Sequence, residues 1–369
     1  MAANDRRNVQ TKKVSMSLFK DKTIVVTGGT GSLGKILTKR LLDETQGKPK
    51  KIIIFSRDEA KQHYMRLEYL NKHKSTDEVI YKNFQNLLEF RIGDVRDYHS
   101  VVSVVKDADI VINAAALKQV PSCEYFPQEA VKTNIEGAEN IVRAIREHSF
   151  NVETVVGVST DKACKPVNVM GMTKAIQEKI FIAANISCPE TRFICVRYGN
   201  VLASRGSVIP LFHDQIKSGG PVTITTDKMT RFLLPLERAV DTIFNAIERA
   251  KAGETFVPRV PATNMVTLAQ ALIQDRGTEI KVTGIRPGEK VDEIMVSDEE
   301  ALRTYESGEF YSIQAMLPEL VKHPIKDPVL KKEYSSGDDL MNLEQTTNYL
   351  KEHNLLLDQD FKEEGEFLR

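Results

Sequence analysis

Short apolar runs alternate with segments of helical periodicity over roughly the first 200 residues of the chain. The runs are rich in Ile and Val and too short for buried helices, which is typical of strands covered on both faces. They read "TIVVTGG", "KIIIF", "LLEFRIGDV", "ADIVINAAA", "VETVVGVS" and "TRFICVRYG". Helices are predicted between them, including a long one over about 125–148 and another over 168–187. This alternation predicts an α/β fold with a doubly wound parallel sheet.

The rhythm ends near residue 200, where Pro and Gly separate shorter elements. We expect residues 201–300 to form a smaller α/β lobe beside the sheet domain of residues 21–200. Residues 1–20 then form an N-terminal extension. The charged and irregular segment 301–369, which ends in "DQDFKEEGEF", is predicted to be a C-terminal arm or tail. Such an arm would pack on a neighbouring subunit of a homo-oligomer, a dimer or a hexamer.

Composition narrows the class of partner and the compartment. Lys and Arg together number 51, as do Asp and Glu, so no basic surface is expected for binding nucleic acid. The four cysteines form no CxxC pair and the seven histidines no HExxH motif, which argues against a disulfide framework or a zinc site. No apolar run reaches the roughly 18 residues of a membrane span, and the polar start lacks the apolar core of a signal peptide. We therefore expect a cytoplasmic protein without a bound metal, a transmembrane segment or a nucleic-acid partner.

A glycine-rich turn follows the first predicted strand in "VVTGGTGSLGK". Its glycines leave the backbone free to turn tightly and to approach a pyrophosphate at the N-terminus of the next helix. The alternative is a tight turn without a ligand. The position between a strand and a helix, at the start of a β-α-β run, favours a dinucleotide site of the Rossmann type. The residues expected to contact the cofactor here are Gly28, Thr30, Gly31, Ser32, Leu33 and Gly34.

The second predicted strand ends at Ser56, which Arg57 follows. An NAD site usually has an acidic residue here for the ribose 2′-hydroxyl, whereas a hydroxyl and a guanidinium suit a 2′-phosphate. This favours NADP over NAD as the cofactor. Residues at the ends of the third and fourth strands are expected beside the adenine and the ribose, although the alanines among them also fit plain helix–sheet packing. They are Asp94, Val95, Ala114, Ala115 and Ala116.

Eight motifs in the chain are specific when they occur together. They read "TGGTGSLG", "FSRDE", "GDVRD", "AALKQVPSCEYFPQEAVKTN", "STDKA", "RYGNVLASRGSVIPLF", "MTRF" and "IRPGEK". Spread over roughly residues 20–300, they resemble the extended short-chain dehydrogenase/reductase family and, within it, the UDP-N-acetylglucosamine 4,6-dehydratases. In this resemblance "STDKA" and "RYGNV…SRGSVIP" separate the group from sugar epimerases and from glucose-type dehydratases.

The resemblance implies an NADP-dependent hydro-lyase that acts on UDP-N-acetylglucosamine. Carbon 4 is oxidised by hydride transfer to NADP⁺, water leaves across carbons 5 and 6, and the hydride returns to carbon 6. The product, a UDP-2-acetamido-2,6-dideoxy-4-keto-hexose, would serve surface polysaccharide or glycan synthesis. Two alternatives stay open: a UDP-sugar 4-epimerase, which returns the hydride to carbon 4, and a non-catalytic NADP-binding protein.

The segment "STDKACKPVNVMGMTK" carries the residues that the resemblance assigns to this chemistry. Lys162 is implied as the base for carbon 5, Asp161 as the acid for the leaving hydroxyl, and Thr160 as the hydrogen-bond donor at the carbon 4 oxygen. They follow the strand "VETVVGVS" at its carboxyl end, where ligands bind in open α/β sheets. These roles require a lowered pKa for Lys162 and a raised pKa for Asp161. On the residues alone, the alternative is a surface ion pair.

Met170-Gly-Met-Thr-Lys174 stands where short-chain dehydrogenases carry Tyr-x-x-x-Lys, and it resembles a branch of these dehydratases with Met-x-x-x-Lys. Lys174 is implied to hold the nicotinamide ribose and to add positive potential beside Lys162. A thioether cannot transfer a proton, so Met170 is either core packing or a spacer against the sugar or the nicotinamide. The group that deprotonates the 4-hydroxyl is left open. The motifs "FSRDE" and "ALKQVPSCE" are closer to the inverting branch, which favours inversion at carbon 5.

The same resemblance assigns further residues to the nucleotide sugar. Arg231 in "MTRF" and Arg286 with Glu289 in "IRPGEK" match contacts to the diphosphate and the ribose. Asn200 in "RYGN" matches the sugar–phosphate region, and Lys118 in "AALKQVPSCE" is expected to contact both cofactor and substrate. On the residues alone, an exposed arginine is usually only a solvated surface charge.

Overall fold

The computed structural model describes residues 17–71, 87–202 and 207–358 of the 369-residue chain. Most of the predicted N-terminal extension lies outside these residues, as do the acidic C-terminal end and the "ASRG" part of the "RYGN" motif. Near the end of that extension, Phe19 is buried against Phe244, with the ring centroids 4.8 Å apart. The described end of the extension therefore packs on the sheet domain.

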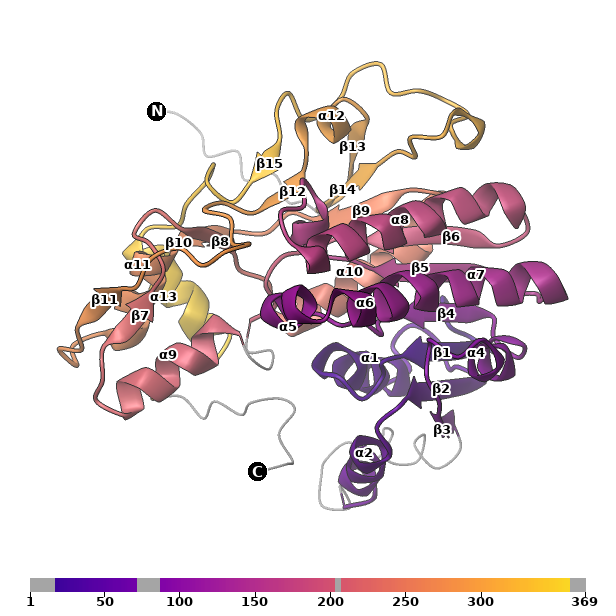
Figure 1. Cartoon of the computed structure of the whole chain (residues 1–369), viewed down its shortest axis with the longest axis horizontal. Coiled ribbons are helices and arrows are strands. Elements are labelled where there is room, and N and C mark those ends of the chain that lie inside the picture. Colours follow the sequence, from indigo (N-terminus) through magenta and orange to yellow (C-terminus); the bar gives the residue numbers. More distant parts are fainter. Residues whose placement is uncertain (1–16, 72–86, 203–206, 359–369) are drawn as a thin grey trace, which may run out of the picture.

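Nine strands form the main sheet, in the order β13-β14-β9-β6-β5-β4-β1-β2-β3. The strands from β3 to β9 pair in parallel, and β14 and β13 add an antiparallel edge. The order around β1 is that of dinucleotide-binding folds, so the predicted fold class is confirmed (Figure 1). The parallel strands are β1 (Thr23–Thr27), β2 (Lys51–Ser56), β3 (Leu88–Ile92), β4 (Ile110–Asn113), β5 (Thr154–Val158), β6 (Arg192–Val196) and β9 (Thr255–Pro258).

Successive residues of each strand face two different apolar layers, one on either side of the sheet. Ile24 and Val26 of β1 pack toward α1, α2 and α10, whereas Val25 packs toward α4, α7 and α8. Because both faces are covered, the central strands are buried and largely apolar, as the sequence pattern indicated, whereas the edge strand β3 carries Glu89 and Arg91 and is only partly buried. No helix among the described residues is long and apolar enough to span a bilayer. The helices that cover the two faces of the sheet are α1 (Ser32–Leu42), α2 (Glu59–Asn71), α4 (Tyr98–Val105), α7 (Gly137–His148), α8 (Val169–Ser187) and α10 (Leu236–Arg249).

The helix predicted over about 125–148 is divided in the structure. A wide π-helical turn, η2 (Val131–Glu136), precedes α7, and this wider turn carries Asn134. The Asn134 amide accepts a hydrogen bond from Leu117 N at 2.8 Å and donates to Leu117 O at 3.0 Å and Thr173 Oγ1 at 2.9 Å. The irregular turn thus ties the loop after β4 to α8, which a regular 3.6-residue pattern does not reveal. The short helices before η2 are α5 (Val120–Tyr125) and α6 (Pro127–Ala130).

A second lobe lies beside the sheet domain, but β9 and α10, which fall within the predicted lobe of residues 201–300, belong to the sheet domain (Figure 1). It has its own apolar core, which includes Phe212, Leu268 and Leu350. Its strands pair as three short two-stranded sheets. The elements of this region are α9 (Val208–Lys217), β7 (Val222–Ile224), β8 (Thr230–Phe232), β10 (Ala262–Asn264), α11 (Met265–Ile273), β11 (Ile280–Val282), β12 (Ile294–Val296), β15 (Tyr334–Ser335) and α13 (Leu343–Glu352).

The described residues after 300 do not form the arm or tail that the sequence pattern predicted. Strands β13 (Thr304–Ser307) and β14 (Phe310–Ile313) extend the main sheet, and α13 packs on α11 in the lobe. All four β14 residues are buried. Each strand is only four residues long, so its apolar positions are too few to stand out among charged neighbours. The remaining short helices are α12 (Asp298–Ala301) and η4 (Pro318–Leu320).

Candidate functional site

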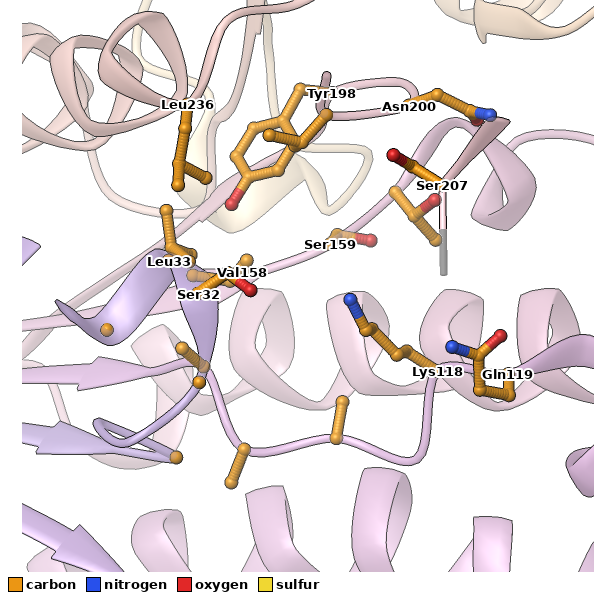
Figure 2. A pocket seen from close by; sticks show the side chains of 18 of the residues that line it. Ser32, Leu33, Lys118, Gln119, Val158, Ser159, Tyr198, Asn200, Ser207 and Leu236 are labelled. Carbon is orange, nitrogen blue, oxygen red and sulfur yellow. The ribbon is translucent and has the colours of Figure 1, made fainter. Parts of the chain in front are cut away.

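A cavity of about 560 Å³ lies at the carboxyl ends of β1, β4, β5 and β6. In Figure 2 the Lys118 side chain rises from the loop after β4 toward Asn200 and Ser207, while Leu33 and Tyr198 lie at the other end. Most residues predicted to bind cofactor or to act on substrate are brought together here. Those that line the cavity are Gly28, Thr30, Gly31, Ser32, Leu33, Gly34, Ala114, Ala115, Ala116, Lys118, Thr160, Lys162, Met170, Lys174 and Asn200.

Two glycines of the first turn have no room for a side chain. Gly28 has a φ of 65°, and a Cβ there would lie 2.8 Å from the backbone of Ala115. A Cβ on Gly34 would lie 2.4 Å from the carbonyl oxygen of Gly29. The turn can therefore press against the loop after β4 and against itself, which leaves the first N–H groups of α1 facing the cavity.

The end of β2 differs in detail from the prediction. Ser56 is buried, and its hydroxyl accepts a hydrogen bond from Gln62 Nε2 at 3.0 Å. Arg57 has 55% of its side-chain surface exposed, and its Nη1 lies 3.8 Å from Asp94 Oδ2. Neither residue lines the cavity, and Asp94 and Val95 do not either. The cavity is lined instead by three side chains that the sequence analysis did not predict: Lys35, Lys61 and Tyr64.

A signal for those three residues was present in the sequence. Lys35 directly follows Gly34 of the turn, and Lys61 and Tyr64 lie three positions apart on α2, on one helix face. Basic side chains at these positions can contact a phosphate on the adenosine half of a dinucleotide.

The segment that carries the predicted catalytic residues begins where β5 ends. Thr160 caps a short helix, η3 (Asp161–Ala163), and its hydroxyl donates to Asp161 Oδ1 at 2.8 Å. Asp161 is 0% exposed, its Oδ1 also accepts from Lys162 Nζ at 3.1 Å, and its Oδ2 is buried without a hydrogen-bond partner. Because the carboxylate is fully buried beside the cavity, the two residues are not a surface ion pair.

Lys162 lies between two carboxylates. Its Nζ is 3.1 Å from Asp161 Oδ1 and 3.0 Å from Glu293 Oε1, and it donates to Asn200 Oδ1 at 3.1 Å. Burial by itself would lower the pKa of the ammonium, but Asp161 and Glu293 outweigh it, so the pKa of Lys162 is raised. This is the opposite of the lowered pKa that the proposed base requires. Sequence reasoning missed Glu293, for which no motif provided a signal.

Lys174 meets neutral acceptors instead of carboxylates. Its Nζ donates to the carbonyl oxygen of Val158 at 2.5 Å and to Gln177 Oε1 at 2.7 Å. Burial lowers the pKa of Lys174 to about 8, although Glu178 opposes this shift. The group is thus a cation near neutral pH that a modest rise in pH discharges.

The Met170 side chain is buried among apolar residues, as suits a thioether. It is 5% exposed and packs with Cys123 and Ala130, and it also lines the cavity. It lies on α8 one turn before Lys174.

A buried ion network lies behind the catalytic segment. Arg197 Nη2 donates to Glu178 Oε2 at 2.6 Å, and Arg197 Nη1 donates to Glu300 Oε2 at 2.8 Å. The Ser159 hydroxyl in turn donates to Glu178 Oε1 at 2.5 Å. The network joins β6, α8 and α12, and through Ser159 it fixes the residue that precedes Thr160.

The residues predicted to hold the diphosphate are not gathered at the cavity. Arg231 is buried, and Arg286 is exposed. Glu289 is partly buried, and its carboxylate accepts from Arg286 N at 3.4 Å. None of the three lines the cavity. The Arg231 guanidinium instead donates to the backbone carbonyls of Thr230, Val291 and Lys290.

Comparison with known proteins identifies the family of the chain. The family described as "Polysaccharide biosynthesis protein" matches residues 24–315. A UDP-N-acetylglucosamine 4,6-dehydratase (inverting) from Campylobacter jejuni is 44% identical over 299 residues, which covers 80% of this chain and 84% of that protein. A UDP-glucose 4-epimerase from Rickettsia bellii is 46% identical over 301 residues, with the same two shares.

Solved structures show the same architecture. Pen from Bacillus thuringiensis has a TM-score of 0.80 and 33% identity, and the match covers 92% of this chain and 99% of that chain. DesIV, a dTDP-glucose 4,6-dehydratase from Streptomyces venezuelae, has a TM-score of 0.60 at 19% identity over 73% of this chain and 86% of that chain, which shows the fold alone. The predicted resemblance to UDP-N-acetylglucosamine 4,6-dehydratases is confirmed by the Campylobacter match. The extent of these matches shows that the chain belongs to the polysaccharide biosynthesis protein family.

Proposed function

We propose that this protein is an NADP-dependent UDP-N-acetylglucosamine 4,6-dehydratase that supplies a 4-keto-6-deoxy sugar for polysaccharide or glycan synthesis. The observation that carries the proposal is the grouping of Thr160, Asp161 and Lys162 at the end of β5, with Lys174 in the same cavity. The Campylobacter relative is named a UDP-N-acetylglucosamine 4,6-dehydratase, which supports the choice of substrate.

The cavity fits a dinucleotide. The glycine turn, which a Cβ at Gly28 or Gly34 would block, would hold the pyrophosphate, and Lys174 would hold the nicotinamide ribose. When bound, NADP⁺ supplies the acceptor for the carbon 4 hydride and gives that hydride back at carbon 6. Arg57 on the exposed end of β2, together with Lys35 and Lys61, supports NADP over NAD, because these cations suit a 2′-phosphate.

Thr160 and Asp161 would carry the proton of the 4-hydroxyl in place of the missing tyrosine. The Thr160 hydroxyl would receive that proton as it passes its own to Asp161 Oδ1, with which it already forms a 2.8 Å hydrogen bond. Asp161, now protonated, would give the proton to the departing 6-hydroxyl, which leaves as water. The protons balance, because the one lost at carbon 4 leaves with the oxygen of carbon 6.

Lys162 would remove the hydrogen at carbon 5 and later return a proton there. The ketone at carbon 4 makes this hydrogen acidic, but the amine must first be neutral. Since two carboxylates raise the pKa of Lys162, turnover should rise with pH until this ammonium is discharged.

The second candidate is a UDP-sugar 4-epimerase, which the name of the Rickettsia relative favours. An epimerase returns the hydride to carbon 4 and needs neither an acid at the 6-hydroxyl nor a base at carbon 5. The buried Asp161 and the lysine beside it would then have no task, which is why we favour the dehydratase.

Product analysis by NMR separates the candidates. UDP-N-acetylglucosamine and, in parallel, UDP-glucose are incubated with the protein and NADP⁺ in deuterium oxide. A dehydratase incorporates deuterium from the solvent at carbon 5. With a substrate that carries deuterium at carbon 4, it moves that label to carbon 6. An epimerase returns that label to carbon 4 and leaves carbon 5 unlabelled, and a non-catalytic protein moves neither. The configuration at carbon 5 tests the expected inversion.

Substitution of Lys162 tests its role within the reaction. Lys162→Ala should still bind NADP⁺ and reduce it in the presence of substrate, since hydride transfer precedes the step that needs the base, but water loss should stop. Lys165→Ala is the matched control, because that exposed lysine pairs with Asp298 and Glu333 away from the cavity. Dehydration by Lys162→Ala at the unmutated rate would show that another group is the base.

A further inference from the structure

Glu293 brings a buried charge from the second lobe to Lys162. It directly precedes β12, is 1% exposed, and does not line the cavity. Its Oε1 lies 3.0 Å from Lys162 Nζ, and its Oε2 is buried without a hydrogen-bond partner. A buried carboxylate with an unused oxygen is costly unless a nearby cation compensates it, and Lys162 provides that cation.

The segment that carries Glu293 is held firmly. Asn168, which caps α8, donates from Nδ2 to the carbonyl oxygen of Gly288 at 2.8 Å. Arg231 donates to the carbonyls of Lys290 and Val291, and its Nε lies 3.8 Å from Glu293 Oε1. The backbone N–H of Glu293 donates to Ser336 Oγ at 2.9 Å. These contacts fix the carboxylate at its distance from Lys162.

Every element around Lys162 contributes a charge or a dipole. Asp161 comes from η3, Glu293 from the segment before β12, Asn200 from the loop after β6, and Arg231 from β8. Lys290, which lies near enough to repel Lys162, donates to the carbonyl oxygen of Cys164 at 2.6 Å. Without Glu293, Asp161 would be the one carboxylate beside three cations, Lys162, Arg231 and Lys290. Burial and the two neighbouring cations would then disfavour the ammonium form of Lys162.

We propose that Glu293 is a positioning residue, which holds Lys162 in its ammonium form beside Asn200 and sets the pH above which Lys162 becomes a free amine. The two ends of this arrangement come from different lobes, so the second lobe controls the protonation of a residue of the first. The consequence for turnover rests on the proposed function, but the control of protonation does not.

The direct test is the titration of Lys162 in the full-length protein. Isotopically labelled lysine side-chain nitrogens are followed by NMR over the pH range in which the protein stays folded, and Lys162→Arg assigns the signal. Glu293→Gln keeps the size of the side chain and removes its charge. We expect the midpoint of Lys162 to fall by about 1 to 3 pH units in Glu293→Gln. The proposal is overturned if the midpoint of Lys162 does not fall in Glu293→Gln, or if Lys162 of that variant stays fully protonated over the whole range.

Two further variants separate charge from structure. Glu293→Asp keeps the carboxylate, so it should restore most of the original titration, which a merely structural role would not predict. Glu306→Gln removes an exposed carboxylate on β13 that pairs with Arg259, and it should leave the midpoint unchanged.

The pH dependence of turnover then links the inference to the reaction. If Lys162 is the base, the rising limb of the rate profile moves to lower pH in Glu293→Gln by the same amount as the NMR midpoint. If the midpoint falls while the protein dehydrates no sugar, the control by Glu293 stands and the proposed function fails. If the protein dehydrates the sugar but the midpoint is unchanged, the reverse holds.

Discussion

Lys162 and Lys174 both line the same cavity, yet their surroundings move their pKa values in opposite directions. Lys162 faces Asp161 and Glu293, and its pKa is raised despite burial. Lys174 faces a carbonyl and an amide oxygen, so burial prevails and lowers its pKa to about 8. The two lysines should therefore lose their charges at well-separated pH values.

Cofactor binding should weaken when Lys174 loses its charge. The ammonium is present below pH about 8 and is lost above it, so affinity for NADP⁺ should fall roughly tenfold between pH about 7 and about 9. In Lys174→Met the affinity should be weak at both pH values and nearly independent of pH. Fluorescence titration with NADPH measures it. An unmutated protein whose affinity is flat over this range would exclude Lys174 as the ribose ligand.

Arg57→Ala should weaken NADP⁺ selectively. The exposed guanidinium near Asp94 is free to turn toward a 2′-phosphate, and a charge-assisted contact of this kind is worth about tenfold or more in affinity. NAD⁺, which lacks that phosphate, is the internal control and should bind equally well to both proteins. Calorimetric titration with both cofactors gives the answer. Equal or tighter binding of NAD⁺ by the unmutated protein would contradict the preference for NADP.

Met170→Ala should reduce stability more than turnover. The side chain packs on Cys123 and Ala130, so truncation should cost about 2–5 kcal/mol in the free energy of unfolding. Met170→Leu conserves the volume and should be close to the unmutated protein in both measurements. Thermal unfolding and turnover are recorded on the same preparations. A folded Met170→Ala protein without activity would mean that the thioether has a role beyond packing.

Thr160→Val and Asp161→Asn should each lose a factor of about 10² to 10⁴ in turnover, because each removes one member of the proposed proton path. Thr160→Ser keeps the hydroxyl that donates to Asp161 and should retain most of the activity. Binding of NADP⁺, measured in parallel, should change little in all three. Full turnover by Thr160→Val would exclude the threonine from the path of the 4-hydroxyl proton.

Arg197→Met should destabilise the fold strongly. Both Arg197 and Glu178 have 3% of their side-chain surface exposed, and the substitution leaves Glu178 and Glu300 buried without their cation. We expect a loss of about 3–5 kcal/mol in the free energy of unfolding, measured by urea denaturation. Arg259→Met removes an exposed partner of Glu306 and should cost about 0–1 kcal/mol. Similar small losses in both variants would show that the buried network contributes little.

Local sequence was sufficient for much of the fold and for the centre of the site. The apolar runs predicted the parallel strands because both faces of each strand are covered, and the glycine turn followed from its place between a strand and a helix. Thr160, Asp161 and Lys162 are adjacent in the chain, so one motif was enough to place all three at the end of β5.

Helix α7 and the C-terminal strands show where a local pattern falls short. The π-helical turn before α7 depends on the hydrogen bonds of Asn134 to Leu117 and Thr173, which lie elsewhere in the chain. Strands β13 and β14 are too short to be recognised, and only pairing with β9 makes them part of the sheet.

The sequence by itself determined the doubly wound sheet, the glycine turn and the adjacency of Thr160, Asp161 and Lys162 at the end of β5, since each depends on neighbours in the chain. Only the tertiary structure decided which charges surround Lys162 and raise its pKa. Glu293 reaches Lys162 from the second lobe, and Arg231 turns to backbone carbonyls of that lobe instead of the cavity. Electrostatic energy depends on distance in space and on burial, and neither can be read from residues so far apart in the chain.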